Sequence, residues 1–225
     1  MGDREAFVFV VVGHTHIVRE THAGALRYRP ALISAERTAA LQRSWETERL
    51  LLRVLGPDSA AAVREYGLRS AQFQKPFDPI RPADFWELPV VADRLVCQEY
   101  EAEQDRSLCL FISHQSEPDR VLGAINLRNI VRGAMQGATL GYGLAPDAIG
   151  NGYMTESAKR IVEIAFYDLE LHRVEVNIMP RNSASLAVAQ RAGFTREGLS
   201  PHYLQINGVW EDHIRFARIA PEPGR

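Results

Sequence analysis

The sequence is short of cysteine, of charge of one sign and of long apolar runs. Its two cysteines, Cys97 and Cys109, are too few for a disulfide framework, so both are expected as reduced thiols of a cytoplasmic protein. The 26 basic and 28 acidic residues leave a formal net charge of -2, so no global field favours nucleic acid or an anionic membrane as a direct partner. The most apolar run, residues 7–12, is too short to span a membrane and lacks the flanks of a signal peptide.

What is present suits one globular domain. The chain has 225 residues, of which 46% are apolar, and this is enough for one sizeable core. Residues 1–46 are the least informative part: strands are predicted at 7–12 and near 26–28, and the role and fold of this extension stay open. The Gly-His-Thr-His motif at residues 13–16 is typical of metallophosphoesterase metal sites, but the further Asp, Asn and His clusters of such sites are missing, so no metal is expected.

From residue 47 onwards the chain alternates between strand-like and helix-like segments. The segment rich in proline and aromatic residues at 76–89 joins two predicted helices, and either lines a pocket or is a packed loop. The three strands after the second helix are joined by short turns, so an antiparallel meander is expected. The predicted elements are a strand at 47–53, a helix after the Gly-Pro-Asp turn at 56–58, a helix at 91–102, and strands at 107–112, 121–127 and 136–144.

Residues 142–156 are predicted as the end of a strand, a glycine turn and the start of a helix. Gly150 and Gly152 flank one residue where the helical pattern begins, so backbone N–H groups can converge on an anion without a Cβ in the way. The first N–H groups of a helix have no partners inside it and the helix dipole adds positive charge, so a pyrophosphate is a fitting ligand. Taken alone, the turn also fits a plain connection, a dinucleotide or a nucleoside phosphate.

Beyond the turn the patterns predict helix, strand, helix and hairpin. Apolar residues at helical spacing between 154 and 165 predict the first helix, and alternation at 173–178 predicts the strand. Asn182 or Ser183 is expected to cap the next helix, which Gly193 ends. The closing elements are hairpin strands at 194–199 and 211–218, an Asn-Gly turn at 207–208, and a polar tail at 219–225.

These elements and their motifs resemble the GNAT superfamily of N-acetyltransferases over residues 47–218. The motifs that carry the likeness are residues 47–50, 129–133 and 141–142, Gly150-x-Gly152-Tyr153-Met154-Thr155-Glu156, Asn182-x-x-Ser185, Gly193-Phe194, Glu197-Gly198 and residues 203–213. Within the superfamily the chain is most similar to ribosomal-protein-alanine N-acetyltransferases of the RimJ/RimL type, and the stretches 129–133 and 203–213 favour RimJ. The resemblance implies an α/β (α+β) fold whose mixed, mostly antiparallel sheet of about seven strands is splayed at two parallel central strands and flanked by about four helices.

The resemblance also implies acetyl-CoA as cosubstrate, with no metal. Backbone groups at the end of the strand would pair with the pantetheine arm, and the amides of the glycine turn would hold the pyrophosphate. Asn182 would bond the pantetheine, and Ser185 would lie near the thioester sulfur. The cofactor-binding residues implied in this way are Tyr142, Gly143, Leu144, Ile149, Gly150, Asn151, Gly152, Tyr153, Met154, Asn182 and Ser185.

Catalytic roles are implied for Ser185, Asp212 and His213. Ser185 would act as acid for the departing thiolate, because the tyrosine that many relatives use is replaced by Ala189. The glutamate base of RimL-type enzymes falls at Leu204, which leaves Asp212 or His213 as the candidate base. Asp212 fits equally well as a structural carboxylate that bonds the hairpin backbone.

Three further residues are candidates for the acceptor groove: Asn129, Tyr203 and Trp210. Aromatic and Asn residues near turns are structural about as often, so both interpretations stay open for them. Asp147 stands where the superfamily often has Gln or Arg, and it is expected to point to solvent, away from a bound pyrophosphate.

The leading hypothesis from the sequence is an acetyl-CoA-dependent N-α-acetyltransferase whose acceptor is a protein N-terminus, that of a small-subunit ribosomal protein beginning with Ala or Ser. One alternative keeps the fold but acetylates a small amine such as an antibiotic, a polyamine or an amino acid. Another is a CoA-binding ribosome-assembly protein without catalysis. The sequence is compatible with a monomer or a homodimer.

Overall fold

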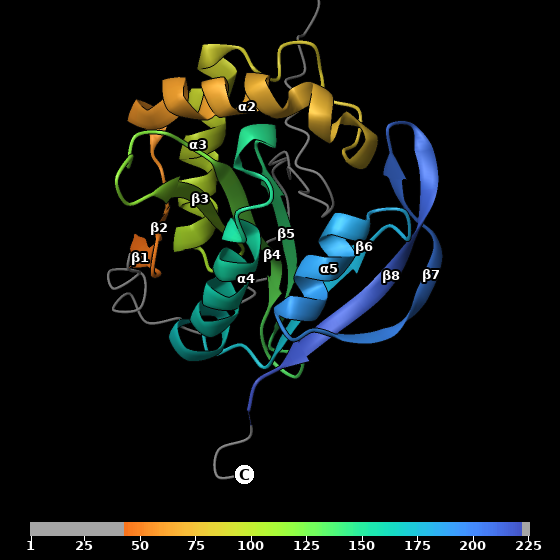
Figure 1. Ribbon diagram of the computed structural model, residues 1–225. Coiled ribbons are helices and arrows are strands. Elements are labelled where there is room, and N and C mark those ends of the chain that lie inside the picture. Colours follow the sequence, from red (N-terminus) through yellow and green to blue (C-terminus); the bar gives the residue numbers. More distant parts are fainter. Residues whose placement is uncertain (1–42, 222–225) are drawn as a thin grey trace, which may run out of the picture.

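The computed structural model describes residues 43–221. The strands predicted at 7–12 and 26–28, the Gly-His-Thr-His motif and most of the tail lie outside the described residues. One mixed sheet organises the described part, and its eight strands lie in the order β1-β2-β3-β4-β5-β6-β8-β7 (Figure 1). This is one strand more than the sequence predicted.

The strands are β1 (Ser44–Glu46), β2 (Leu50–Arg53), β3 (Leu108–His114), β4 (Gly123–Val131), β5 (Gly137–Leu144), β6 (Arg173–Ile178), β7 (Thr195–Ile206) and β8 (Val209–Ile219). The α-helices are α2 (Ala60–Gln74), α3 (Leu88–Glu103), α4 (Tyr153–Glu163) and α5 (Ser183–Arg191). Short turns of 3-10 helix are η1 (Pro57–Ser59), η2 (Lys75–Phe77) and η3 (Pro146–Ala148), and η4 (Ile164–Asp168) is a π-helical continuation of α4.

The sheet is antiparallel except at its centre. β3, β4 and β5 form the antiparallel meander that the sequence predicted. In residues 43–221, β5 and β6 are the one parallel pair of neighbours. The crossover between them contains α4, as a parallel connection requires. The expected arrangement, a mostly antiparallel sheet with two parallel central strands and four helices, is therefore confirmed.

Helices cover both faces of the sheet (Figure 1). α2 and α3 pack on one face, where their apolar residues meet Cys109 and Phe111 of β3. α4 and α5 pack on the other face, where Met154, Ala158 and Ile161 of α4 contribute to the larger core cluster. The helical spacing of the apolar residues in α4 and the strict alternation of buried residues in β6 place these side chains inward. The free energy of apolar burial, about 1.5–3 kcal/mol for each large side chain, therefore holds both layers to the sheet.

Three element boundaries differ from the sequence prediction for local reasons. The sheet already includes Ser44–Glu46, which pair with β2 ahead of residue 47. β2 itself begins at Leu50, because a turn with Thr47 N–H bonded to Leu50 O interrupts the predicted strand. The closing hairpin is longer than predicted, since β7 and β8 extend to the Asn207-Gly208 turn as a ribbon of mostly exposed residues with irregular register. Such a ribbon lacks the apolar alternation from which strands are recognised.

No helix within residues 43–221 is long and apolar enough to cross a membrane. No group of three His, Cys, Asp or Glu side chains in the same range is arranged so that it could hold a metal ion. Both cysteines are free thiols: Cys97 is exposed and Cys109 is buried.

Candidate functional site

The two parallel strands separate at the centre of the sheet. Their pairing ends at Leu140 and Val176, while β4 follows β5 up to Leu144. The carbonyl of Gln136, the residue before β5, accepts a hydrogen bond of 2.6 Å from His172 N–H. Backbone groups alternate in direction along a strand, so residues 138, 140, 142 and 144 also direct theirs towards the β6 side. By this alternation the N–H groups of Tyr142 and Leu144 face a gap that no strand of residues 43–221 fills. A free strand edge inside a folded domain can bind an extended ligand through backbone hydrogen bonds.

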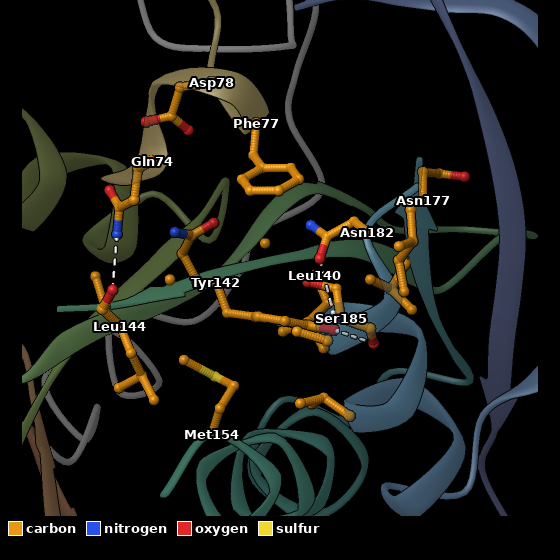
Figure 2. Close-up of a pocket in the computed structure, with 18 of the residues that line it drawn as sticks. Gln74, Phe77, Asp78, Leu140, Tyr142, Leu144, Met154, Asn177, Asn182 and Ser185 are labelled. Atoms are coloured by element: carbon orange, nitrogen blue, oxygen red, sulfur yellow. Dashed lines mark hydrogen bonds between the residues drawn. The ribbon is translucent and has the colours of Figure 1, made fainter. Parts of the chain in front are cut away.

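A groove of about 1210 Å³ passes through this gap (Figure 2). One end, which we call the α4 end, is lined by residues 149, 150 and 152–156 at the start of α4. The other, the α3 end, lies on the opposite face of the sheet and is lined by residues of α3 and of the segment between α2 and α3. The proline- and aromatic-rich segment 76–89 therefore lines a pocket, which was one of the two interpretations left open by the sequence. The groove is large enough for an elongated cofactor and an acceptor together.

The α4 end has the geometry of an anion site. Gly150 and Gly152 have φ angles of 83° and 78°, which side chains other than glycine rarely adopt. Within the described part of the chain, nothing lies within 4 Å of a Cβ built on Gly150 and no side chain caps α4, so the first N–H groups of the helix remain available. Asn151 fixes the turn by donating from Nδ2 to the carbonyls of Ala148 and Ile149 at 3.3 and 3.2 Å.

Positive charge borders this anion site. A Cβ on Gly152 would lie 3.5 Å from Nη2 of Arg49, and the Arg49 guanidinium stacks on the ring of Tyr153 at 4.8 Å. Lys159 also lines the groove. Asp147 is exposed, as expected, and its carboxylate pairs with Arg120 and lies 3.3 Å from Nε of Arg69, so its charge is neutralised away from the turn.

Glu156 ties the start of α4 to the edge of the sheet. Its carboxylate accepts hydrogen bonds from the Thr47 hydroxyl, from Arg49 N–H at 3.0 Å and from the Arg49 guanidinium at 2.8 and 2.6 Å. Burial acts to raise the pKa of this carboxyl, but the bonds from Thr47 and Arg49 together outweigh it, so the pKa is lowered. Negative charge in the first turn also suits the helix dipole. The sequence motif around residues 47–50 thus positions the glycine turn.

The lowered pKa of Glu156 makes part of the stability dependent on pH. A group whose pKa is lower in the folded state stabilises it fully above the unfolded pKa, near 4.5, and loses this contribution as pH falls through the folded pKa. We expect Glu156→Gln to lower the free energy of unfolding by about 2 kcal/mol at pH 7, since it weakens charged hydrogen bonds. Urea unfolding between pH 7 and pH 3 measures both effects. The difference between the wild type and the variant should shrink towards low pH; a constant difference would contradict the assignment.

The start of α5 forms the side of the groove opposite α4. Asn182 Oδ1 accepts a hydrogen bond of 3.1 Å from Ser185 N–H and caps the helix, so of the two caps considered Asn182 is the one used. The Tyr142 hydroxyl donates to Ser185 O at 3.1 Å, and burial raises the pKa of this phenol, which keeps it a donor. The Ser185 side chain itself lines the groove beside Tyr142 (Figure 2). These contacts fix Ser185 relative to the free edge of β5.

Two residues of α2 that the sequence analysis missed hold the end of β5. Gln74 Nε2 donates to Leu144 O at 3.2 Å (Figure 2). The Tyr66 hydroxyl donates to Gly143 O at 3.2 Å. Gln74 also donates to the Tyr66 hydroxyl at 3.2 Å. A side chain at Gly143 would lie 2.8 Å from Gln74 Nε2, so glycine is needed for this approach. No local pattern marks Gln74 or Tyr66, because their partners lie about 70 residues further along the chain.

His213 is the residue of the closing hairpin that is best placed to accept a proton in the groove. It is 3% exposed, lines the groove and packs edge-on against Tyr203 at 5.6 Å between ring centroids. Burial lowers the pKa of its imidazole, so the ring is neutral near pH 7. Nδ1 lies 3.0 Å from the Glu211 carbonyl and donates to it, which leaves Nε2 as the proton acceptor.

Two other residues of the hairpin lie outside the groove. Asp212 Oδ1 accepts a hydrogen bond of 2.8 Å from His202 N–H, where β7 is irregular and His202 has a φ of 47°. Asp212 is therefore the structural carboxylate that the sequence allowed. Trp210 is 58% exposed beside the hairpin turn and is not among the residues that line the groove. Their neighbour Tyr203 does line it, because the irregular register turns the faces of the two strands differently.

Asn129 completes the set of predicted site residues. It lines the α3 end of the groove with a φ of 50°, at the point where β4 shifts its register against β5. Leu204, where relatives of the RimL type have a glutamate, also lines the groove. Ala189, where many relatives have a tyrosine, is buried in the core. The groove thus brings Asn129, Tyr203 and His213 to the α3 side of the gap and Asn182 and Ser185 to the other.

Comparison with known proteins agrees with this geometry. The profile of a family described as Acetyltransferase (GNAT) domain matches residues 49–195. YjcK of Bacillus subtilis, named as a probable N-acetyltransferase, is 37% identical over 163 residues, which are 72% of this chain and 90% of the relative. The ribosomal protein uS5-alanine N-acetyltransferase of Escherichia coli is 29% identical over 181 residues, 80% of this chain and 93% of the relative.

A solved structure extends the likeness to three dimensions. Mycobacterium smegmatis RimJ in complex with CoA-disulfide superposes with a TM-score of 0.73 at 27% sequence identity, and the match covers 78% of this chain and 84% of that chain. The sheet order, the separation of β5 from β6 and the glycine turn before α4 are thus accompanied by a family match over most of the domain. The chain belongs to the GNAT family of acetyltransferases.

Proposed function

We propose that this protein transfers acetyl from acetyl-CoA to the α-amine of a protein N-terminus, and that the acceptor is a small-subunit ribosomal protein beginning with Ala or Ser. One observation carries the cofactor part: the free edge of β5 and the uncapped glycine turn of α4 line a single groove. The acceptor part is supported by the similarity to the uS5-alanine N-acetyltransferase. We further propose residues 44–219, which contain β1 to β8, as the catalytic unit; this is slightly wider at both ends than the 47–218 predicted from the sequence.

The residues present fit acetyl-CoA, which supplies an activated acetyl group as a thioester. The N–H groups of residues 149–154 are free to bind a pyrophosphate, with the guanidinium of Arg49 beside them. Backbone groups of residues 142–144 can pair with an extended amide chain. Asn182 uses Oδ1 as a cap, so its Nδ2 is the group left to donate to a ligand.

Groups of this chain can stabilise the negative charge that develops in an acyl transfer and can donate and accept its protons. The N–H groups of Tyr142 and Leu144 are fixed donors for an oxygen that gains negative charge, because Gln74 and Tyr66 hold the strand end in place. The Ser185 hydroxyl can donate a proton to the departing sulfur and take one back from water. His213 Nε2 can accept a proton from the acceptor amine, directly or through water.

An α-amine needs less help from a general base than a lysine side chain does. The pKa of a peptide α-amine is about 7.7–8.0, so roughly a tenth is already neutral at pH 7. A lysine side chain has a pKa of about 10.4 and is neutral in under about one part in a thousand. Attack by an N-terminal amine therefore asks less of His213 than attack by a lysine would.

The experiment that tests the proposal follows CoA thiol release with purified protein, acetyl-CoA and synthetic peptides. Peptides that begin with Ala or Ser should release CoA and gain one acetyl group at the α-amine by mass spectrometry. The same peptides with a blocked α-amine and a free lysine are the matched control and should be inert. Release only with small amines would favour the small-molecule alternative, and tight CoA binding without any release would favour a non-catalytic role; either result would reject the proposal.

A further inference from the structure

The α3 end of the groove is lined by three arginines and by a pair of aromatic rings. We call Arg81, Arg94 and Arg128 the arginine cluster; all three line the groove, as do Phe85 and Trp86. The guanidinium carbons of Arg81 and Arg94 lie 4.4 and 4.1 Å from the centroid of the Phe85 ring. They lie 5.5 and 5.0 Å from that of Trp86. Both cations are thus held in place by stacking on the same two rings.

Carboxylates are few among the described residues that line this end of the groove. Among the described residues that line the groove, Asp78 is the one carboxylate at the α3 end, and it pairs with Arg81 at 2.6 Å. Glu48 and Glu156, the other acidic lining residues, belong to the α4 end. Asp78 is therefore committed to one guanidinium, that of Arg81.

Arg94 shows the consequence most clearly. Its Nη1 donates to the Phe85 carbonyl at 3.0 Å, and no carboxylate in residues 43–221 forms an ion pair with it. Burial, followed by the charge of Arg81, lowers the pKa of the Arg94 guanidinium to about 10, so it remains charged at pH 7. A largely desolvated cation beside another cation is unfavourable until an anion joins it. A planar guanidinium with unused N–H donors matches a carboxylate in particular.

We propose that the groove selects an acceptor N-terminus that carries an Asp or Glu side chain at its second or third residue, bound by Arg94 of the arginine cluster. This inference rests on the proposed function, because it places the α-amine at the gap between β5 and β6. Arg128 lies opposite Thr139, three residues from Tyr142, which corresponds to about 10 Å along the strand. An extended peptide spans roughly 3.3–3.6 Å per residue, so the side chain of its second or third residue reaches this region.

The test compares pairs of Ala-initiated peptides that differ only by Glu or Gln at the second or third position. With wild-type protein, kcat/KM should be about 10-fold or more higher for the Glu peptide of at least one pair, as expected for one desolvated charge-assisted contact. In Arg94→Gln this ratio should fall to near one. Mass spectrometry should place the acetyl group on the α-amine in every case.

Arg64→Gln is the matched control. Arg64 Nε also donates to a carbonyl of the same segment, Trp86 O at 2.8 Å, but Arg64 does not line the groove. This variant should keep the wild-type ratio, and thermal unfolding of both variants shows whether the segment stays folded. Equal kcat/KM for Glu and Gln peptides in the wild type, or a ratio that survives Arg94→Gln, would overturn the inference. Failure of the proposed function looks different, because no peptide of either kind would then release CoA, and the inference falls with it.

Discussion

Replacement of Gly150 by valine is expected to weaken acetyl-CoA binding about 100-fold. The φ of 83° at Gly150 lies in the left-handed region, where a β-branched residue is strongly disfavoured. The turn would therefore rearrange, and its N–H groups would no longer converge. Loss of about 3 kcal/mol of charge-assisted hydrogen bonding corresponds to a factor of about 100 in the dissociation constant. Titration calorimetry with CoA and acetyl-CoA measures this factor directly.

Gly133→Val is the control that separates the loss of stability caused by backbone strain from the loss of acetyl-CoA binding. Gly133 has a similar φ of 73° and, as at Gly150, no atom of residues 43–221 lies within 4 Å of a Cβ built on it. It sits in the connection between β4 and β5 and does not line the groove. Both variants should lower the midpoint of thermal unfolding by similar amounts, but Gly133→Val should bind acetyl-CoA like the wild type. Equal loss of binding in both, or in neither, would show that Gly150 does not form the anion site.

Gly150 also illustrates which parts of the site a sequence can predict. Gly150, Gly152 and Asn182 act on neighbours within three or four residues, through positive φ angles and a helix cap, and such features leave local patterns. The order of strands and helices is local in the same sense, because apolar periodicity records which face of each element is buried. The meander, α4 and β6 were predicted for this reason.

Contacts between segments that are distant in the sequence leave no local pattern from which they can be predicted. Gln74 and Arg94 both lie in ordinary amphipathic helices, and their roles depend on where β5 and the 76–89 segment pack. Their helical patterns predict helices and say nothing of the groove. In the hairpin the motif can be recognised from the sequence, but the direction of each side chain cannot. Asp212 and Trp210 belong to this motif, yet the irregular register places only some of its residues at the groove. Side-chain direction in a bulged strand is set by register, which the motif does not specify.

The same division applies to the two ends of the groove. The α4 end is built from backbone groups, so many sequences that keep the glycines can form it. The α3 end is built from side chains of α3, β4, β8 and the segment between α2 and α3, which can vary independently of the cofactor site. Cofactor chemistry therefore follows from the family, whereas acceptor choice must be read from this chain's own residues, with Arg94 and His213 as the charged and titratable groups to test.

Ser185→Ala is expected to lower kcat about 100-fold while the KM for acetyl-CoA changes less than about threefold. The Ser185 hydroxyl would assist only as the thiolate departs, and the loss of a general acid costs roughly 10²–10⁴ in rate. The structural contacts of this position use its backbone, since Ser185 N–H bonds Asn182 and Ser185 O accepts from Tyr142. Alanine retains both contacts and is a better helix former, so the fold and the cofactor site should persist. Steady-state kinetics with an Ala-initiated peptide measure this effect. Ser185→Thr is the control variant that keeps a hydroxyl, and a partial recovery of kcat in it would support the role of Ser185 as an acid. An unchanged kcat in alanine would transfer that role to water, and His213 would then be the one side chain of the site proposed to move a proton.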